Sequence, residues 1–392
     1  RDYKVTGVQT CALPISSTGT LLPCPEKSID WEGTKNLFVE GDNLEALKLL
    51  QKSYSNKVKM IYIDPPYNTG NEFIYPDKFQ ENLDTYLKYT GQMDSDGMKL
   101  SSSTEASGRK HTNWLNMIYP RLKIARSLLS DDGMILISID DNEVENLCQV
   151  CNEIFGPESL VAKFLWKSRQ TSDSRKSTKV SADHEYIICY AKNIDSAKLN
   201  GKLIDVGKYK IPDNDPRGPW ASENLTVQAT KNQRPNQFYD IVEPVTGRAF
   251  PANPKRVWAR SKSVVEKMIS EGRVLFPSDD SGRPREKKFL NELGSDRTGF
   301  STWLDSKVVG YTTNGTRDFS ALFEERIFDF PKPINLLKTL LDQCTDSNSM
   351  VLDFFAGSSG LAQAVFELNF DDNGCRRFIM VQLPEILGEK TE

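Results

Sequence analysis

Short apolar runs alternate with stretches of helical periodicity along most of the chain after residue 36. Val58–Ile63 is a nearly continuous, β-rich apolar run, which is typical of a strand buried on both faces. Asp42, with Glu45 three positions later, predicts the start of a helix. Other strands are expected at Leu37–Glu40, Met134–Ile139, Val161–Trp166, Glu185–Ala191, Met350–Phe354 and Phe378–Leu383.

Helical stretches fill the intervals between these runs. The pattern from Trp114 to Leu129 predicts a long helix, kinked or broken near Pro120, and the Ser- and Gly-rich segment Asp94–Lys110 before it is expected to be a mobile loop. Strand and helix alternate at both ends of the chain, which predicts an α/β fold with a doubly wound parallel sheet. Further helices are expected at Glu143–Phe155, Pro333–Cys344 and Ser359–Leu368.

The middle of the chain has a different texture. Regular periodicity fades from Lys192 to about Ser320, so we expect an insert at 192–320 between two halves of one domain, 17–191 and 321–392. A length of 392 residues agrees with two or three domains. The first 16 residues (RDYKVTGVQTCALPIS) resemble the translated read-through of a sequencing adapter, and 1–16 is therefore expected to be a non-native tail.

Charge is distributed unevenly along the chain. The net charge of −4 is the sum of −7 in residues 1–160, +9 in 161–300 and −6 in 301–392. A basic middle segment favours a polyanionic partner, although a solvated surface with a chance excess of charge explains the same numbers equally well.

Cysteine and apolar content restrict the class of protein. Seven scattered cysteines do not form a disulfide framework, so a reducing cytoplasm is expected. Cys148 and Cys151 lack a second ligand pair at zinc spacing, and we expect them to be small core residues on one helix face and the chain to bind no metal. No apolar run approaches the roughly 18–20 residues of a membrane span.

A glycine-containing turn, Asp353–Gly360 (DFFAGSSG), joins an expected strand to an expected helix. Small residues at such a turn let backbone N–H groups approach a ligand at the helix N-terminus. The alternative is a tight turn needed only for packing. The turn matches neither a phosphate-binding P-loop nor the GxGxxG dinucleotide fingerprint, which argues against an unrelated nucleotide-binding oxidoreductase.

A second motif, Asp64-Pro65-Pro66-Tyr67, follows the buried strand Val58–Ile63. A carboxylate, a proline carbonyl and an aromatic ring suit a flat substrate whose exocyclic amino group needs two hydrogen-bond acceptors. A strand-terminating turn with a capping Asp is the structural alternative. If Val58–Ile63 and Met350–Phe354 are neighbours in the sheet, both motifs open on one crevice.

These residues resemble a known enzyme family. Asp64-Pro65-Pro66-Tyr67 matches the catalytic tetrapeptide of amino-methylating DNA methyltransferases, and Asp353–Gly360 resembles their S-adenosyl-L-methionine loop. Catalytic motif first and cofactor loop last is the permuted order of the β class. The whole chain further resembles the modification subunit of type III restriction–modification systems, in the stretches Asn36–Gly70, His111–Glu143, His184–Asn193, Asn214–Thr226, Phe328–Leu337 and Arg376–Glu385.

The resemblance implies a Rossmann-like methyltransferase sheet with an inserted DNA-recognition domain, and methyl transfer to the N6 amino group of a flipped-out adenine. Asp64 and the Pro65 carbonyl would hold that amino group, and Tyr67 would stack on the base. The implied partners are double-stranded DNA, a second copy of the chain and a restriction (helicase–nuclease) subunit. The implied cofactor-binding residues are Asp353, Phe355, Gly357, Gly360, Asp42, Asn43, Lys332 and Gln382.

Two positions depart from the family pattern. Ser359 stands where a second loop glycine is usual, and Gln382 where an acidic residue usually binds the ribose hydroxyls. Weaker cofactor binding is therefore expected, and a catalytically weak DNA-recognition subunit that serves a partner nuclease remains an alternative. Transfer to cytosine N4, or to RNA, is another, although the leading Asp64 favours adenine.

The insert would then contact DNA. Its Arg and Lys residues are interleaved with aromatic ones, a pattern typical of phosphate contacts combined with base reading. The residues expected to bind DNA are Arg217, Trp220, Arg234, Lys255, Arg256, Arg260, Arg283 and Arg285.

Overall fold

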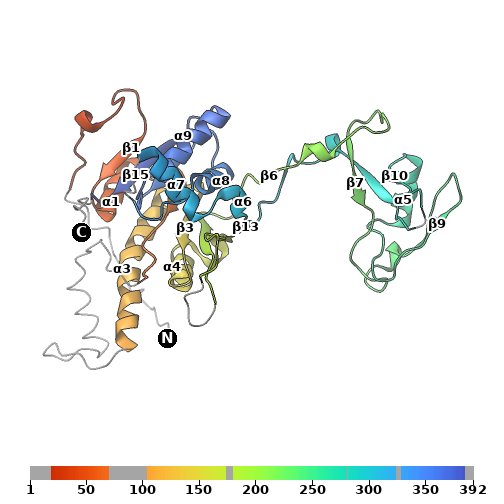
Figure 1. Ribbon diagram of the computed structural model, residues 1–392, viewed down its shortest axis with the longest axis horizontal. Helices are drawn as coiled ribbons and strands as arrows, with labels where there is room; N and C mark the ends of the chain where they lie inside the picture. The colour runs from red at the N-terminus through yellow and green to blue at the C-terminus, as the bar shows by residue number, and fades with distance from the viewer. Residues whose placement is uncertain (1–18, 70–103, 174–179, 280, 324–327, 385–392) are drawn as a thin grey trace, which may run out of the picture. The chain divides into compact units, whose positions relative to one another are not determined.

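The computed structural model describes residues 19–69, 104–173, 180–279, 281–323 and 328–384 (Figure 1). They form two compact units, one made of the described residues up to Asn200 and from Phe300 onward, the other of Gly201–Gly299. The second unit is narrower than the insert expected at 192–320, because both ends of that range belong to the first unit. The tail expected at 1–16 lies outside the described residues.

The first unit is built on a mixed sheet. β5 runs antiparallel to both of its neighbours, β3 and β4, whereas the other strand pairs are parallel. The expectation of a parallel sheet was wrong for this strand, which pairs directly with the preceding β4 as in a hairpin. The strand order is β1 (Leu37–Glu40), β15 (Arg377–Gln382), β14 (Met350–Asp353), β2 (Val58–Ile63), β3 (Leu129–Ile139), β5 (Glu185–Ala191), β4 (Leu160–Trp166) and β13 (Trp303–Leu304).

Helices cover both faces of this sheet, because alternate side chains of each strand point to opposite faces (Figure 1). Ile61 and Ile63 of β2 pack into one apolar core and Met60 and Tyr62 into the other. The architecture is therefore doubly wound, as expected. The first core includes α1 (Asn43–Tyr54), α3 (Thr104–Leu128) and α4 (Val144–Phe155), and the second includes α8 (Ile334–Cys344) and α9 (Gly360–Asp372).

Helix α3 differs from its prediction at its start. It begins at Thr104, so residues 104–110 are helical and not part of a loop, while 94–103 lie outside the described residues. It also continues unbroken through Pro120. Trp114, Ile118 and Leu122 are fully buried in the core, and this packing offsets the hydrogen bond that proline removes.

The second unit has its own small core around Trp258 and Phe250. A three-stranded sheet, ordered β10 (Val274–Leu275), β11 (Arg285–Phe289) and β7 (Trp220–Asn224), stands beside α5 (Lys262–Ser270). The first and last strands of the unit, β6 (Lys202–Leu203) and β12 (Arg297–Thr298), pair with each other. β8 (Ile241–Val242) pairs with β9 (Ala249–Phe250).

Two smaller expectations can be compared with this fold. Cys148 and Cys151 are buried on α4 and pack in the core, as expected. Among the described residues, none of the helices is long and apolar enough to cross a membrane.

Candidate functional site

The two sequence motifs meet at the carboxyl edge of the sheet. β2 and β14 are parallel neighbours, with Ile61 opposite Leu352, so Asp64 after β2 and Asp353 at the end of β14 lie close to each other. They line one hollow, shared with the loop that precedes α8. Its other walls are Tyr62, Phe328, Pro331, Lys332, Leu337, Phe355, Ala356, Gly357, Ser358, Gly360 and Leu361.

The Asp64-Pro65-Pro66-Tyr67 segment is fixed at two points. The indole Nε1 of Trp114 on α3 donates a hydrogen bond of 2.6 Å to the Pro66 carbonyl. The Tyr67 hydroxyl donates to Glu185 Oε2 at 2.9 Å. Burial raises the pKa of Tyr67 well above its usual value, so the hydroxyl stays protonated and remains a donor.

Lys332 belongs to the Asp64 site, although the sequence assigned it to the cofactor. Its ammonium lies 3.0 Å from Asp64 Oδ2 and 3.1 Å from Glu185 Oε2. It also donates to the Tyr67 hydroxyl at 2.8 Å. Burial favours the neutral amine, but the two carboxylates outweigh that effect and raise the pKa of Lys332. The same residue lines the hollow next to Asp353, so it borders both halves of the site.

Glu185 is the site residue that the sequence interpretation missed. It is the first residue of β5, and because β5 is antiparallel, its beginning lies at the edge where the parallel strands end. An all-parallel sheet would have placed Glu185 at the opposite edge. The feature of the sequence that could have identified it is a charged residue, Glu185, immediately before the apolar run that forms the rest of β5.

The two oxygens of Asp64 differ in their surroundings. Oδ2 faces Lys332, whereas Oδ1 is buried and has no hydrogen-bond partner among the described residues. Burial raises the pKa of Asp64, and the Lys332 charge limits that rise. An unsatisfied buried carboxylate oxygen is costly unless a ligand supplies the missing donor.

Asp353 begins the glycine-containing turn and is 3% exposed. Burial raises the pKa of Asp353 to about 8; the Phe355 N–H, which donates to Oδ1 at 2.9 Å, opposes the rise, and the Asp64 charge adds to it. Gly357 in the same turn has φ +51°, and a Cβ there would lie 2.9 Å from a ring carbon of Phe328. The turn therefore requires glycine at this position.

The start of α1 is connected to the same turn. Asn43 donates to the Phe354 carbonyl at 2.7 Å and accepts from buried Arg121 at 2.6 Å. Asp42 caps α1 by accepting from the Glu45 N–H at 3.0 Å, and its other oxygen lies 3.6 Å from Arg121. Asn43 thus supports the loop from behind, while the Asp42 side chain is 38% exposed.

Gln382 turns toward the loop. Its Oε1 accepts from the Gly357 N–H at 2.7 Å, and its Nε2 donates to the Leu383 carbonyl. The acceptor expected to bind a ribose hydroxyl is engaged with the protein's own backbone. The position lies at the end of β15, beside the turn, as the sequence predicted.

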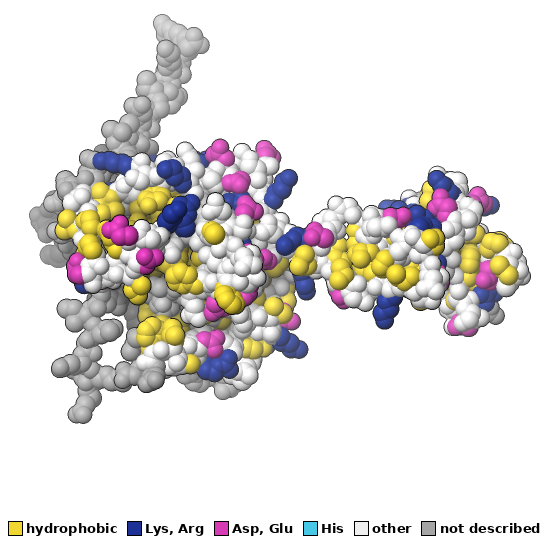
Figure 2. All heavy atoms as spheres, turned by 90° about the horizontal axis from the view of Figure 1, so that it is seen from above, with side chains coloured by type: hydrophobic (Ala, Val, Ile, Leu, Met, Phe, Trp, Pro, Cys, Tyr) yellow, Lys and Arg dark blue, Asp and Glu magenta, His cyan; other side chains and the backbone are white. Residues whose placement is uncertain are grey.

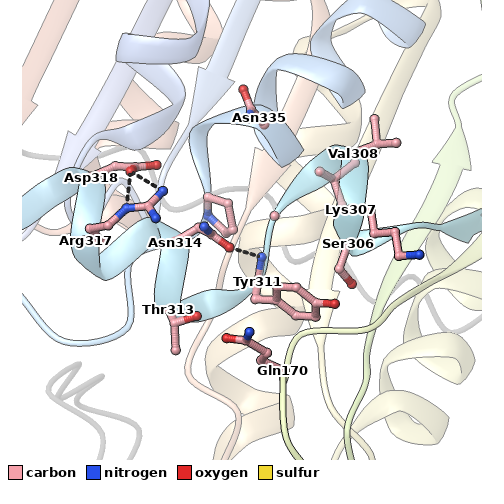
Figure 3. A pocket seen from close by; sticks show the side chains of 13 residues that line it. Gln170, Ser306, Lys307, Val308, Tyr311, Thr313, Asn314, Arg317, Asp318 and Asn335 are labelled. Atoms are coloured by element: carbon pink, nitrogen blue, oxygen red, sulfur yellow. Dashed lines mark hydrogen bonds and ion pairs between the residues drawn. The ribbon is translucent and has the colours of Figure 1, made fainter.

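A second hollow of about 520 Å³ lies next to the site (Figure 3). α6 (Ser306–Val309) and α7 (Thr312–Phe323) form one side, and Gln170 after β4 belongs to the other. Pro333, which directly follows Lys332, also lines it. Lys307 and Arg317 bring positive charge to it, although Arg317 pairs with Asp318 at 3.3 Å.

The residues expected to bind DNA all lie in the second unit, where they fall into two groups. Arg217 pairs with Asp215 at 2.6 Å, Arg260 with Glu286 at 3.4 Å, and Trp220 is buried with its Nε1 bonded to Asp213. Each of these three side chains therefore already interacts with a carboxylate of the same unit.

The second group has no carboxylate partner among the described residues. Arg256, Arg283 and Arg285 line a hollow of about 500 Å³ and bond only to neutral groups, such as Thr226 and the Pro251 carbonyl. Arg234 and Lys255 are also exposed. Figure 2 shows Lys and Arg side chains of this unit beside apolar ones.

Comparisons with known proteins agree with this chemistry. Residues 58–383 match the family model described as DNA methylase. The chain is 36% identical over 365 residues to the type III restriction-modification enzyme StyLTI Mod subunit of Salmonella typhimurium, covering 92% of this chain and 54% of that protein. It is 32% identical over 385 residues to the EcoPI Mod subunit of Escherichia phage P1, covering 91% and 59%.

A solved structure, the PvuII DNA methyltransferase (cytosine-N4-specific), resembles it with a TM-score of 0.40 and 11% identity over 90% of this chain and 86% of that one. The chain spans a little over half the length of the two Mod subunits that it matches.

Proposed function

The chain belongs to this DNA methylase family, and from that membership we propose that it methylates the N6 amino group of an adenine flipped out of double-stranded DNA. The observation that carries the proposal is Asp64 Oδ1, a buried acceptor without a hydrogen-bond partner among the described residues. It lies in a hollow that also holds Asp353 and the glycine turn. An amino donor and a methyl donor would meet there.

S-adenosyl-L-methionine is the cofactor that fits the residues of this hollow. Asp353 offers a buried carboxylate to an amino-acid ammonium, the Phe328 and Phe355 rings offer π faces to a sulfonium cation, and Gly357 keeps the turn open. Asp42, after β1, leaves a partly exposed carboxylate for the adenosine end. Asn43 and Gln382 support the turn from its protein side, and we assign them no direct contact with the cofactor.

The mechanism follows from the substrate. The N6 lone pair of adenine is delocalised into the ring and is a poor nucleophile, so the site must aim it. Asp64 Oδ1 and the Pro65 carbonyl would accept the two amino hydrogens, and Tyr67 would stack on the base, which offsets part of the few kcal/mol that flipping costs. When bound, the cofactor supplies an electrophilic methyl group.

Orientation and hydrogen bonding then provide most of the rate gain. As nitrogen gains the methyl group it must lose a proton. Asp64 Oδ1, which would accept one of the amino hydrogens, is placed to receive that proton, and burial raises the pKa of Asp64.

The target base and the assembly with other subunits are part of the same proposal. The leading Asp64 favours adenine N6 over cytosine N4. The names of the two Mod relatives suggest a modification subunit of a type III restriction–modification system, which would act with a second copy of itself and a restriction subunit. Digesting methylated DNA and identifying the modified nucleoside decides the base, and co-purification with the restriction subunit tests the assembly.

Two observations favour a second candidate, a recognition subunit with weak cofactor binding. Gln382 uses its acceptor on the Gly357 N–H, and Ser359 occupies a left-handed backbone position with φ +57°. Titration calorimetry with S-adenosyl-L-methionine separates the candidates, because an inert cofactor site releases no binding heat.

The second unit would contact the DNA phosphates. Arg256, Arg283 and Arg285 have charges that no described carboxylate neutralises, which suits phosphate contacts. The 520 Å³ hollow has room for a nucleotide that flanks the target, with Lys307 near its phosphate.

Asp64→Ala tests the function directly. We expect methyl transfer to fall by about 100- to 1,000-fold or more, because the variant loses the acceptor that aims the amino group. Cofactor affinity should change little. A radiolabelled-methyl assay and calorimetry measure the two quantities.

Asp371→Ala is the matched control, since the ion pair that Asp371 on α9 makes among the described residues is with Lys338 at the surface. Near-normal transfer by Asp64→Ala would exclude Asp64 from the reaction.

A further inference from the structure

Lys332 is held on all sides. An ammonium has three donors and no acceptor, and Asp64, Glu185 and the Tyr67 hydroxyl supply three acceptors at 3.0, 3.1 and 2.8 Å. The rings of Tyr67 and Trp166 lie 4.9 and 5.8 Å from the same nitrogen. The side chain is 11% exposed. Lys332 therefore has no donor left for a substrate.

We propose that Lys332 and Glu185 form a positioning pair for the methyl-accepting site. Lys332 holds Asp64 by Oδ2 and leaves Oδ1 turned to the amino group, while Glu185 fixes the Tyr67 hydroxyl and with it the ring that meets the base. The inference rests on the proposed function, since it assigns these roles toward an amino-group substrate.

Glu185 prevents Lys332 from acting as a simple counter-ion. With one carboxylate, the ammonium and Asp64 would form an isolated pair, and the ammonium could follow Asp64 in any movement. With two carboxylates, Lys332 is anchored from β5 as well as from the end of β2, so Asp64 accepts from a donor whose position is fixed. The hydrogen bond from Tyr67 to Glu185 extends this anchoring to the aromatic ring.

The charges around Asp64 give the pair opposite electrostatic effects. The titratable groups that act on Asp64 or share its cluster are Lys332, Glu185, Tyr67, Tyr62 and Asp353. Lys332 is the cation among them. Removing it leaves Asp64 near two acidic groups and favours the protonated carboxyl, whereas removing the Glu185 charge favours the carboxylate.

The test compares Lys332→Met with Glu185→Gln in the full chain. We expect the acid limb of the kcat–pH profile to move up by about 1–3 pH units in Lys332→Met, and down in Glu185→Gln. Lys332→Arg keeps the charge but changes the donor geometry, so its acid limb should stay near wild type while kcat falls. Shifts in the same direction, or no shift in either variant, would overturn the proposal.

Lys338→Met is the matched control. Lys338 on α8 also lies between two carboxylates, Asp371 and Glu367, but away from the site, and its loss should leave the profile unchanged. Carboxyl 13C NMR of Asp64, assigned with Asp64→Asn, measures the same shifts without DNA or cofactor. If the wild type transfers no methyl group, the proposed function fails, yet the titration still supports or overturns the pair.

Discussion

At the scale of single residues, Asp353 shows how burial and chemistry compete. Its carboxyl is almost completely enclosed, and its hydrogen bond from the Phe355 N–H does not compensate for lost hydration, so its pKa rises to about 8. A ligand ammonium would reverse this balance by pairing with the carboxylate. The carboxyl would pair with a cation, which none of the described residues provides in its immediate surroundings.

This burial predicts a pH-dependent stability. The folded protein keeps the Asp353 proton up to about pH 8, whereas the unfolded chain loses it near pH 4. The contribution of this carboxyl to the free energy of unfolding therefore falls as pH rises between those values. Asp353→Asn should remove this dependence of stability on pH. The variant should therefore be more stable than wild type at pH 8 by at most about 5 kcal/mol. Urea unfolding at pH 5 and pH 8 measures the difference.

Asp371→Asn, at an exposed carboxylate, should retain the wild-type slope. An equal slope in Asp353→Asn and wild type would mean that Asp353 is ionised in the folded protein at neutral pH.

At the scale of elements, the turn between β14 and α9 combines two left-handed positions of different character. Gly357 has φ +51° and a neighbouring ring that leaves no room for a side chain. Ser359 has φ +57° directly before α9, where its side chain makes no capping hydrogen bond. The first position needs glycine for space and conformation, whereas the second only tolerates serine.

Substitutions at these two positions should have opposite effects. Ser359→Gly relieves left-handed strain of about 1–2 kcal/mol but adds unfolded-state entropy, so we expect a gain of up to about 1 kcal/mol. Gly357→Ala introduces both strain and a clash with Phe328, and should lose at least about 1 kcal/mol. Thermal or urea unfolding of both variants measures these changes. A loss in Ser359→Gly would mean that the serine hydroxyl stabilises the turn.

The same scale explains what the sequence could and could not reveal. β2 and β14 are apolar runs that end in motif residues, so both their positions and their common edge followed from periodicity and the strand rule. The direction of β5 did not, because an apolar run carries no information on whether it pairs parallel or antiparallel. Glu185 was missed for that reason alone. The loop prediction for residues 104–110 failed because apolar periodicity marks only the part of α3 from Trp114 onward, whereas the helix begins at Thr104.

At the scale of the whole molecule, charge counts overstate the free charge of the second unit. Residues 201–299 carry 18 Lys and Arg against 13 Asp and Glu, a net charge of +5. Several of these cations form ion pairs inside the unit, among them Arg217, Arg260, Arg273 and Lys287. The remainder, including Arg256 and Arg283, determines where a polyanion would bind.

Salt dependence separates the two classes of arginine. In the full chain, Arg256→Gln and Arg283→Gln should each weaken DNA binding and reduce the slope of log affinity against log salt by about 1, because each would remove one of the proposed phosphate contacts. Arg260→Gln, at an ion-paired residue, should change the slope by less than half of that. Fluorescence anisotropy with duplex DNA at several salt concentrations measures all three. Equal effects from the three variants would mean that ion pairing does not decide which arginines meet DNA.

The pairing of β6 with β12 has a consequence for how such proteins diversify. Because Lys202–Leu203 pairs with Arg297–Thr298, the chain enters and leaves the second unit at neighbouring points. A unit bounded in this way can be replaced by one of different length and sequence without moving any strand of the large sheet. Under the proposed function, recombination at these two short strands would exchange the unit proposed to contact DNA and leave the residues of the proposed methyl-transfer site unaltered.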